Sequence, residues 1–337
     1  MMKNWLAAGA LALTAGLTAT AAQAQTTTVP GEQVGLATGA PLPEGVYALN
    51  TFVYRSPDAP VVNSPVDVAV NVPVLVWATP FVPLGGRIEL LVAPPTVFAF
   101  GRNGGPTGIK DLSISVGTFV GGIWAFDLGG NFGVSVLGGV YLNDLNGDRG
   151  VLVQNNGAFV GAPVLSQLAS NTYRAGIAAS YTGDGYNLTA NLTGNFYDSP
   201  GRFDGANVAG FGNTRGPFVI SDSLNLDLTA TKKFDLFNEG KPKFEFGAIG
   251  YGTVNVGNAA SIVGRQGRFA LGGLVGYDFG LFTAQAYVAR DVVTQARFVD
   301  ATGRSRDIEN TEGWVRIIVP LYSPAPAPAP APIVRKY

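Results

Sequence analysis

The side chains that could carry chemistry here are carboxylates, amines, guanidiniums and hydroxyls, because the 337 residues include no His and no Cys. A Ser-His-Asp arrangement needs an imidazole as its general base, and the usual zinc sites need His or Cys ligands. Pairs of carboxylates could still act as acid and base. No glycine-rich phosphate motif opens a helix. We therefore expect no enzyme, no metal site and no cofactor.

The segment NDLNGDRG at 143–150 places Asp144, Asn146 and Asp148 at the spacing of calcium ligands. The bidentate Glu that closes such a loop is missing downstream, so the segment is interpreted as a turn. The formal net charge is -1, which gives no reason to expect a nucleic-acid partner.

The elements that must position the remaining polar groups show a period of two. From Val66 to Val76 every second residue is Val, while Asp67 and Ala69 fall on the opposite face. Twelve segments resemble strands of this kind: 44–56, 66–78, 86–99, 109–125, 131–143, 171–183, 185–197, 222–234, 242–254, 266–279, 281–291 and 312–322. Because Gly117, Gly121 and Gly122 interrupt 109–125, we expect a bend or bulge there.

The predicted fold class is all-β, a transmembrane antiparallel up-and-down β-barrel of about twelve strands over residues 44–322. No apolar run after the first 25 residues is long enough for a membrane helix. The connections alternate between longer and shorter, as outer loops and periplasmic turns do in such barrels. This alternation predicts that both termini lie in the periplasm and that 144–170 and 198–221 are the largest outer loops.

The segments outside the barrel have their own signatures. Residues 1–24 combine Lys3, an apolar stretch and Ala22-Gln23-Ala24, as in a signal peptide that is cleaved before Gln25. The Thr/Pro/Gly-rich segment 25–43 is either flexible or a plug in the lumen. The Pro/Ala-rich tail at 323–337 favours an extended conformation in the periplasm, as a plain terminus or as a tether.

Charged residues within the strands should point into the lumen, because Lys or Arg facing lipid at the bilayer midplane costs about 2–4 kcal/mol. The mixed signs fit either ion pairs that fill the interior or groups that guide a solute. Aromatic residues near strand ends (Tyr54, Trp77, Tyr197 and Trp314) are expected in interfacial girdles. Residues Leu137 and Ile249, nearer mid-strand, suggest a partly apolar lumen. The lumen-lining candidates are Asp67, Arg87, Glu89, Asp111, Arg174, Asp227, Lys243, Glu245, Arg268, Asp278 and Arg316.

Between Pro73 and Leu112 the sequence carries PVLVWATPFVPLGGR, then APP at 93–95 and TGIKDL at 107–112. These motifs resemble outer-membrane proteins of the phenol meta-pathway degradation family, the SphA-type or COG4313-like porins. The resemblance extends over about 44–322 and does not include the tail. It implies a channel for small hydrophobic or aromatic compounds and supplies no catalytic or binding residues. Within the motifs, Arg87 and Asp111 are expected to pair across neighbouring strands, as a structural clasp or as a solute contact.

The function expected from these features is passive uptake of small hydrophobic or aromatic compounds across the bacterial outer membrane. Expected partners are outer-membrane lipid, the barrel-assembly machinery during biogenesis and a small hydrophobic solute. The alternative is a structural or surface-interaction barrel whose outer loops or periplasmic tail carry the function.

Overall fold

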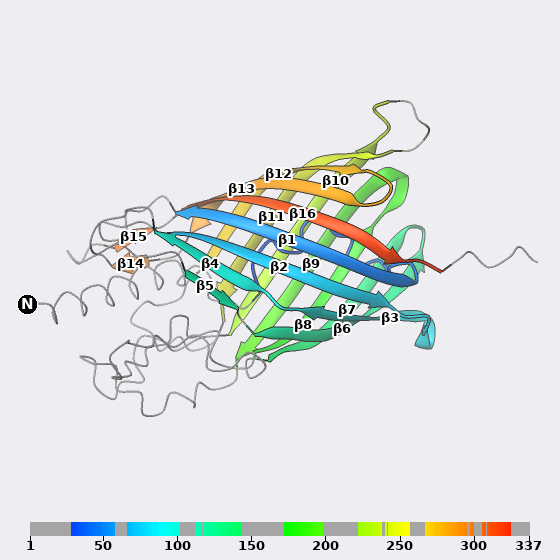
Figure 1. Cartoon of the computed structure of the whole chain (residues 1–337), viewed down its shortest axis with the longest axis horizontal. Helices are drawn as coiled ribbons and strands as arrows, with labels where there is room; N and C mark the ends of the chain where they lie inside the picture. The colour runs from blue at the N-terminus through cyan, green and yellow to red at the C-terminus, as the bar shows by residue number, and fades with distance from the viewer. Residues whose placement is uncertain are drawn as a thin grey trace, which may run out of the picture.

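The computed structural model describes residues 28–57, 66–101, 112–115, 117–142, 172–197, 222–237, 240, 242–256, 267–294, 297–299, 305–307 and 309–324. They form a closed antiparallel β-barrel of twelve strands, which confirms the predicted fold class. Figure 1 shows the strands lying side by side along the molecule. The largest predicted outer loops and the Pro/Ala tail fall almost entirely outside the described residues. The segment NDLNGDRG lies wholly outside them.

Each strand of the wall occupies a segment with the predicted alternation. The described strands are β1 (Gly45–Pro57), β2 (Val66–Ala78), β3 (Gly86–Ala93), β4 (Thr96–Gly101), β5 (Leu112–Ser115), β6 (Thr118–Gly129), β7 (Phe132–Leu142), β8 (Thr172–Tyr181), β9 (Tyr186–Tyr197), β10 (Ser223–Phe234), β11 (Phe244–Asn255), β12 (Gly267–Asp278), β13 (Thr283–Thr294), β14 (Arg297–Val299), β15 (Ser305–Asp307) and β16 (Asn310–Tyr322). The short β14–β15 hairpin forms a separate sheet.

Two of the twelve wall strands are interrupted. Elements β3 and β4 both pair with β2, and Pro94 and Pro95 separate them because proline has no N–H to donate to the ladder. Elements β5 and β6 are separated at 116–117, where Gly117 has φ 56°. The bend expected in 109–125 therefore falls at Gly117, whereas Gly121 and Gly122 lie inside the paired part of β6.

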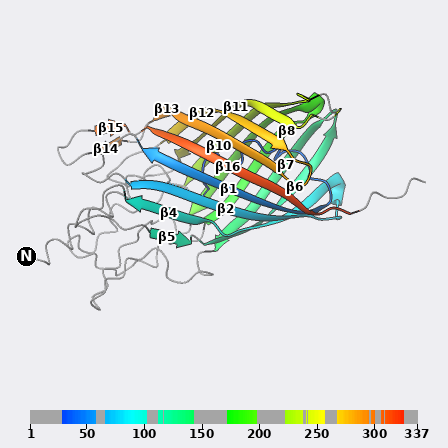
Figure 2. The same ribbon diagram turned by 45° about the horizontal axis from the view of Figure 1, so that its top comes forward.

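The barrel closes where β1 pairs with both β2 and β16. Figures 1 and 2 show the long, strongly tilted strands that this closure requires. Connections between the strands alternate in length as expected. The shorter connections, which include 130–131, 182–185 and 279–282, lie at one end of the barrel. This end is called the short-connection end below, and the opposite end the long-connection end. Strand β16 finishes at the short-connection end, where β1 begins.

The two faces of the wall differ in the way that a lipid-facing barrel requires. Side chains such as Val136, Ile177 and Leu271 are apolar and exposed, whereas Asn191, Thr229 and many other polar side chains are buried. Among the described residues, no helix is long and apolar enough to cross a membrane.

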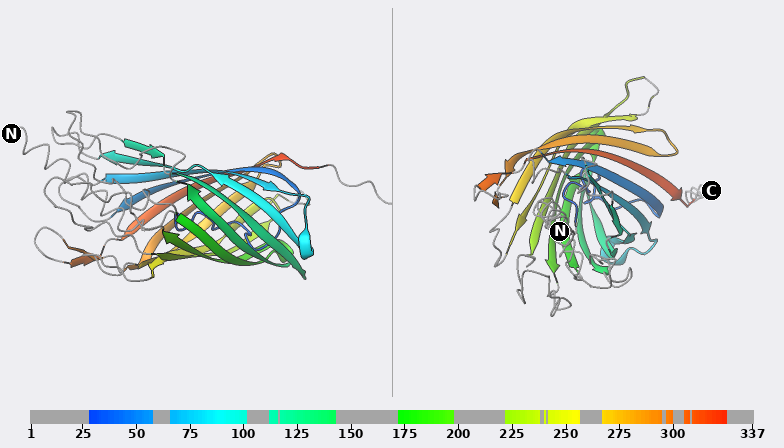
Figure 3. Two further views of the ribbon diagram at one scale, coloured as in Figure 1. Left: turned by 90° about the horizontal axis from the view of Figure 1, so that it is seen from below. Right: turned by 60° about the vertical axis from the view of Figure 1, so that its left-hand side comes forward.

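Residues 28–43, called the plug below, lie inside the ring of strands, where Figure 3 shows them as a dark-blue trace. The plug is built from tight turns, with hydrogen bonds from Glu32 N to Val29 O and from Ala40 N to Ala37 O, both 2.9 Å. Gly35 has φ 82°, and a Cβ atom there would lie 2.7 Å from Leu274 Cδ1, so this close approach requires glycine.

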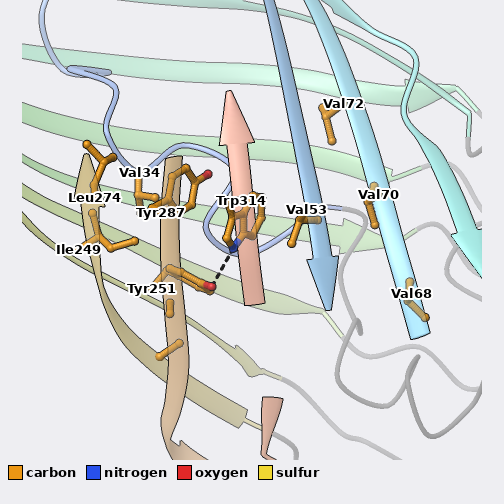
Figure 4. Packing of buried hydrophobic residues seen from close by; sticks show 12 residues of the cluster. Val34, Val53, Val68, Val70, Val72, Ile249, Tyr251, Leu274, Tyr287 and Trp314 are labelled. Carbon is orange, nitrogen blue, oxygen red and sulfur yellow. Dashed lines mark hydrogen bonds between the residues drawn. The ribbon is translucent and has the colours of Figure 1, made fainter. Parts of the chain in front are cut away.

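A buried hydrophobic cluster joins the plug to both sides of the barrel closure. Figure 4 shows Val34 beside Tyr287 and Leu274, with Trp314 between Tyr287 and Val53. The rings of Tyr287 and Trp314 are stacked with centroids 5.1 Å apart. The core of the molecule is therefore in the lumen.

Replacing the lipid-facing Ile177 with Arg should lower the free energy of unfolding by about 2–4 kcal/mol, because the charge would face hydrocarbon near mid-strand. Urea titration in lipid vesicles, followed by tryptophan fluorescence, measures the change. Leu236→Arg, in the connection between β10 and β11, is the matched control and should cost about 0–1 kcal/mol. Equal losses for the two variants would show that the face of Ile177 does not contact lipid.

Candidate functional site

Arg316, on β16, holds the plug through backbone carbonyl groups. Its guanidinium donates hydrogen bonds to Glu32 O and Val34 O, and its Nε donates to Thr51 Oγ1 on β1 at 2.9 Å. The side chain is fully buried. Because an unpaired backbone carbonyl in a dry interior is costly, these bonds favour one position of the plug.

A second set of contacts fixes Gly31 and Glu32 of the plug to β8 and β10, and Arg174 extends this set to β7. Arg174 Nη1 donates to Glu32 Oε1 at 2.9 Å, and Arg174 Nη2 donates to Tyr141 Oη at 2.6 Å. Across the lumen, Gly31 N donates to Asp227 Oδ1 at 2.8 Å. Arg174 and Glu32 are both buried, and each neutralises the charge of the other, as buried charges require.

A third cluster lies at the long-connection end, where its hydrogen bonds and ion pairs join strands of the wall to one another. Glu312 on β16 accepts hydrogen bonds from Arg55 on β1 and from Tyr251 on β11. Arg268 Nη2 lies 2.7 Å from Glu312 Oε1, and Arg268 Nη1 lies 3.2 Å from Asp291 Oδ1. This network joins five strands around the closure of the barrel, which is a structural role.

An apolar cavity of about 450 Å³ lies between the plug and the wall formed by β1, β2, β3, β6 and β7. It extends from Arg174, near the long-connection end of β8, to Glu89, near the short-connection end of β3. Aliphatic and aromatic side chains form most of its lining, among them Val72, Val74, Leu91, Phe119, Ile123 and Leu137.

The charged groups of the cavity are gathered at its two ends. One end has the Glu32–Arg174 pair, with the Arg174 guanidinium over the rings of Phe119 and Tyr141 at 4.7 and 4.8 Å. At the other end, Glu89 Oε1 accepts a hydrogen bond from Leu42 N at 2.8 Å. A mainly apolar lining with a small number of polar groups is the usual composition of a small-molecule site.

The structure buries six of the lumen-lining candidates on the inner face: Glu89, Arg174, Asp227, Glu245, Arg268 and Arg316. Only Glu89 and Arg174 line the cavity. Glu245 accepts from Thr231 and Gln285 instead. Arg87 is half-buried and donates to Thr79 O. Lys243 and Asp278 lie next to the short connections, where Asp278 accepts from Gly280 N.

Two candidates differ from the expectation. Alternation along β2 places Asp67 with Leu75 and Trp77, on the face opposite the valines, so the assignment of Asp67 to the lumen face is corrected. The reason is that the lumen beside β2 is apolar, so the valines face inward. Asp67 is nevertheless buried and has an interaction partner. Asp111 lies outside the described residues, and with it the proposed Arg87–Asp111 pair.

Other positions were missed or misassigned from the sequence. Arg55, Asp291 and Glu312 have the inward parity of their strands, so the alternation rule could have found them, whereas Glu32 belongs to the plug and has no such signal. Trp314, expected in a girdle, is buried in the lumen, where its Nε1 donates to Tyr251 Oη at 3.0 Å. Among the residues that the structure describes, no group of His, Cys, Asp or Glu could hold a metal ion.

Comparison with known proteins shows that this chain is similar to other proteins in its fold. No protein-family profile and no curated protein matches the sequence. The COG4313 outer membrane channel from Pseudomonas putida F1 aligns with a TM-score of 0.58 at 11% identity, covering 87% of this chain and 99% of that one. The β domain of the Bordetella autotransporter BrkA aligns at 0.47 and 12% identity, covering 83% and 100%. CymD, a monoaromatic hydrocarbon channel, aligns at 0.41 and 9%, covering 83% and 90%.

Replacing Arg316 with Met should loosen the plug and lower the free energy of unfolding by about 1.5–3 kcal/mol, because charge-assisted bonds to the plug are lost. A loosened plug should also admit small polar solutes, measured as swelling of proteoliposomes in arabinose. Arg290→Met is the control, because the Arg290–Glu309 pair is exposed and worth about 0–1 kcal/mol. Unchanged swelling in the Arg316 variant would show that Arg316 does not hold the plug closed.

Proposed function

We propose that this protein is a passive outer-membrane channel for small hydrophobic or aromatic compounds. The observation that carries the proposal is the apolar cavity between the plug and the wall. It lies in the lumen of a closed barrel and extends between the levels of Arg174 and Glu89 along the barrel. A solute moving through the lumen would therefore cross an apolar section in the middle of its path.

The size of the cavity suits a small aromatic molecule. An engineered apolar cavity of about 150 Å³ is large enough to bind benzene. The cavity here has about three times that volume, at about 450 Å³. Transfer of apolar surface from water contributes roughly 25 cal/mol per Å², so an apolar solute would enter without an energy source other than its concentration gradient.

The plug supports selectivity for apolar solutes. Its backbone is hydrogen-bonded to polar side chains on β8, β10, β13 and β16, which fill one half of the lumen. The remaining half, where β1, β2, β3, β6 and β7 meet the plug, is lined mainly by apolar side chains. Hydrated ions and sugars would lose hydrogen bonds in this passage, whereas a hydrocarbon would not.

The location in the outer membrane is part of the same proposal. The apolar outer wall suits lipid as its partner and assembly of the barrel by the machinery that inserts such proteins. The similar fold of an outer membrane channel supports this location and a channel function. The resemblance of 73–112 to SphA-type porins supports the same solute class.

Replacing Leu137 with Trp should fill part of the cavity and slow uptake by about tenfold, equivalent to about 1.4 kcal/mol of lost solute binding. Initial uptake of labelled ethylbenzene by host cells that produce the barrel measures this rate. Val136→Trp is the matched control, because Val136 is the neighbouring residue on the exposed outer face. Its uptake should equal that of the unaltered protein at the same amount of protein in the outer membrane.

Two results would contradict the proposal. If cells with the unaltered barrel take up ethylbenzene no faster than cells without it, the protein is not a channel for this class. If the Leu137 and Val136 variants slow uptake equally, solute does not pass through the cavity. Either outcome would favour the structural or surface-interaction alternative.

A further inference from the structure

The cavity has two carboxyl groups in its lining, and they differ in their remaining hydrogen-bonding capacity. Glu32 is occupied at both oxygens, because Oε1 accepts from Arg174 Nη1 and Oε2 accepts from Val29 N at 3.3 Å. Glu89 accepts from Leu42 N at Oε1 only. Among the described residues, no side chain or backbone group donates to Glu89 Oε2.

The surroundings of Glu89 leave this oxygen available to a molecule in the cavity. The side chain is 3% exposed, so it does not face bulk water. Arg87 lies two residues away on the same face of β3, but its Nη1 donates to Thr79 O. Tyr47, the nearby hydroxyl, donates to Pro43 O at 2.9 Å. A buried acceptor of this kind favours a ligand that donates a hydrogen bond.

We propose that the cavity selects solutes that carry a hydroxyl group on an apolar body, and that Glu89 accepts the hydrogen bond of that hydroxyl. This inference rests on the proposed channel function and names its solute class more narrowly. The apolar body would contact the lining of β2, β6 and β7, while the hydroxyl lies at the short-connection end of the cavity.

A neutral hydroxyl fits the charges better than an ionised head group does. A carboxylate would be repelled by Glu89 itself. An ammonium group would meet Arg174 at one end of the cavity and lie near Arg87 at the other, so part of its attraction to Glu89 would be cancelled. A hydroxyl gains the bond to Glu89 without either repulsion.

Benzyl alcohol and anisole test this selection, because they are isomers and only the alcohol can donate a hydrogen bond. Titration calorimetry with the full-length barrel in detergent should show benzyl alcohol binding about tenfold more tightly than anisole, as expected for the net contribution of one hydrogen bond. In Glu89→Gln, the amide oxygen can still accept from Leu42 N, while the amide nitrogen becomes a donor toward the solute. The ratio of the two affinities should then fall to within about twofold.

The matched control is Glu245→Gln. Glu245 lies on β11, and its carboxyl group is buried but does not line the cavity. The affinity ratio of this variant should equal that of the unaltered protein. A variant that no longer binds anisole has lost its cavity, because anisole needs the apolar lining and no acceptor. Benzylamine, compared with both isomers, distinguishes an ammonium donor from a hydroxyl donor.

The outcomes separate this inference from the function on which it rests. If the unaltered protein binds the two isomers equally, or if Glu89→Gln keeps the full ratio, hydroxyl selection by Glu89 is wrong while the channel proposal stands. If benzylamine binds more tightly than benzyl alcohol, the preferred head group is an ammonium and the inference is overturned. If neither isomer binds and cells with the barrel show no added uptake of ethylbenzene, the channel proposal itself fails.

Discussion

The hydrogen bonding of the plug backbone is the constraint on which the lumen depends. A segment of turns inside a membrane barrel has N–H and C=O groups that neither lipid nor a neighbouring strand satisfies. Side chains of the wall supply the missing partners: Asp227 for Gly31 N, Ser180 for Gly39 N, and Arg316 for two carbonyls. Many of the polar residues of the barrel interior are therefore explained by the plug that they hold.

This requirement divides the lumen into unlike halves. Strands β8, β9, β10 and β13 present hydroxyl, amide and carboxyl groups to the plug, and β16 adds Arg316. The strands β1 to β3, β6 and β7 present mainly aliphatic and aromatic groups and make few polar contacts with it. A void between the plug and the polar half would be filled by water, whereas a void against the apolar half can take an apolar solute. The cavity is on the side where this physical argument places it.

The sequence predicted the wall well because alternation and length are local properties. The predicted 66–78 is β2 without change, and 185–197 differs from β9 by one residue. The interior was less predictable, since a charge was assumed to point inward wherever it occurred. That rule worked for Arg174 and Arg316, but it put Asp67 on the wrong face, because the valines of β2 pack against an apolar lumen. Glu32 has no periodic signal, since its position is set by a partner 142 residues away.

The plug is attached unevenly along its length, and this bears on how a solute could pass a filled barrel. Its first part is fixed by Asp227, Arg174, Tyr287 and Arg316. The part from Leu36 to Pro43, which lines the cavity, is joined to the wall by single bonds at Thr38, Gly39, Leu42 and Pro43. Small shifts of a segment held by isolated bonds cost less than shifts of one held by a charged network. The firmly held part therefore keeps the polar half closed, while the lightly held part forms the wall that a solute contacts.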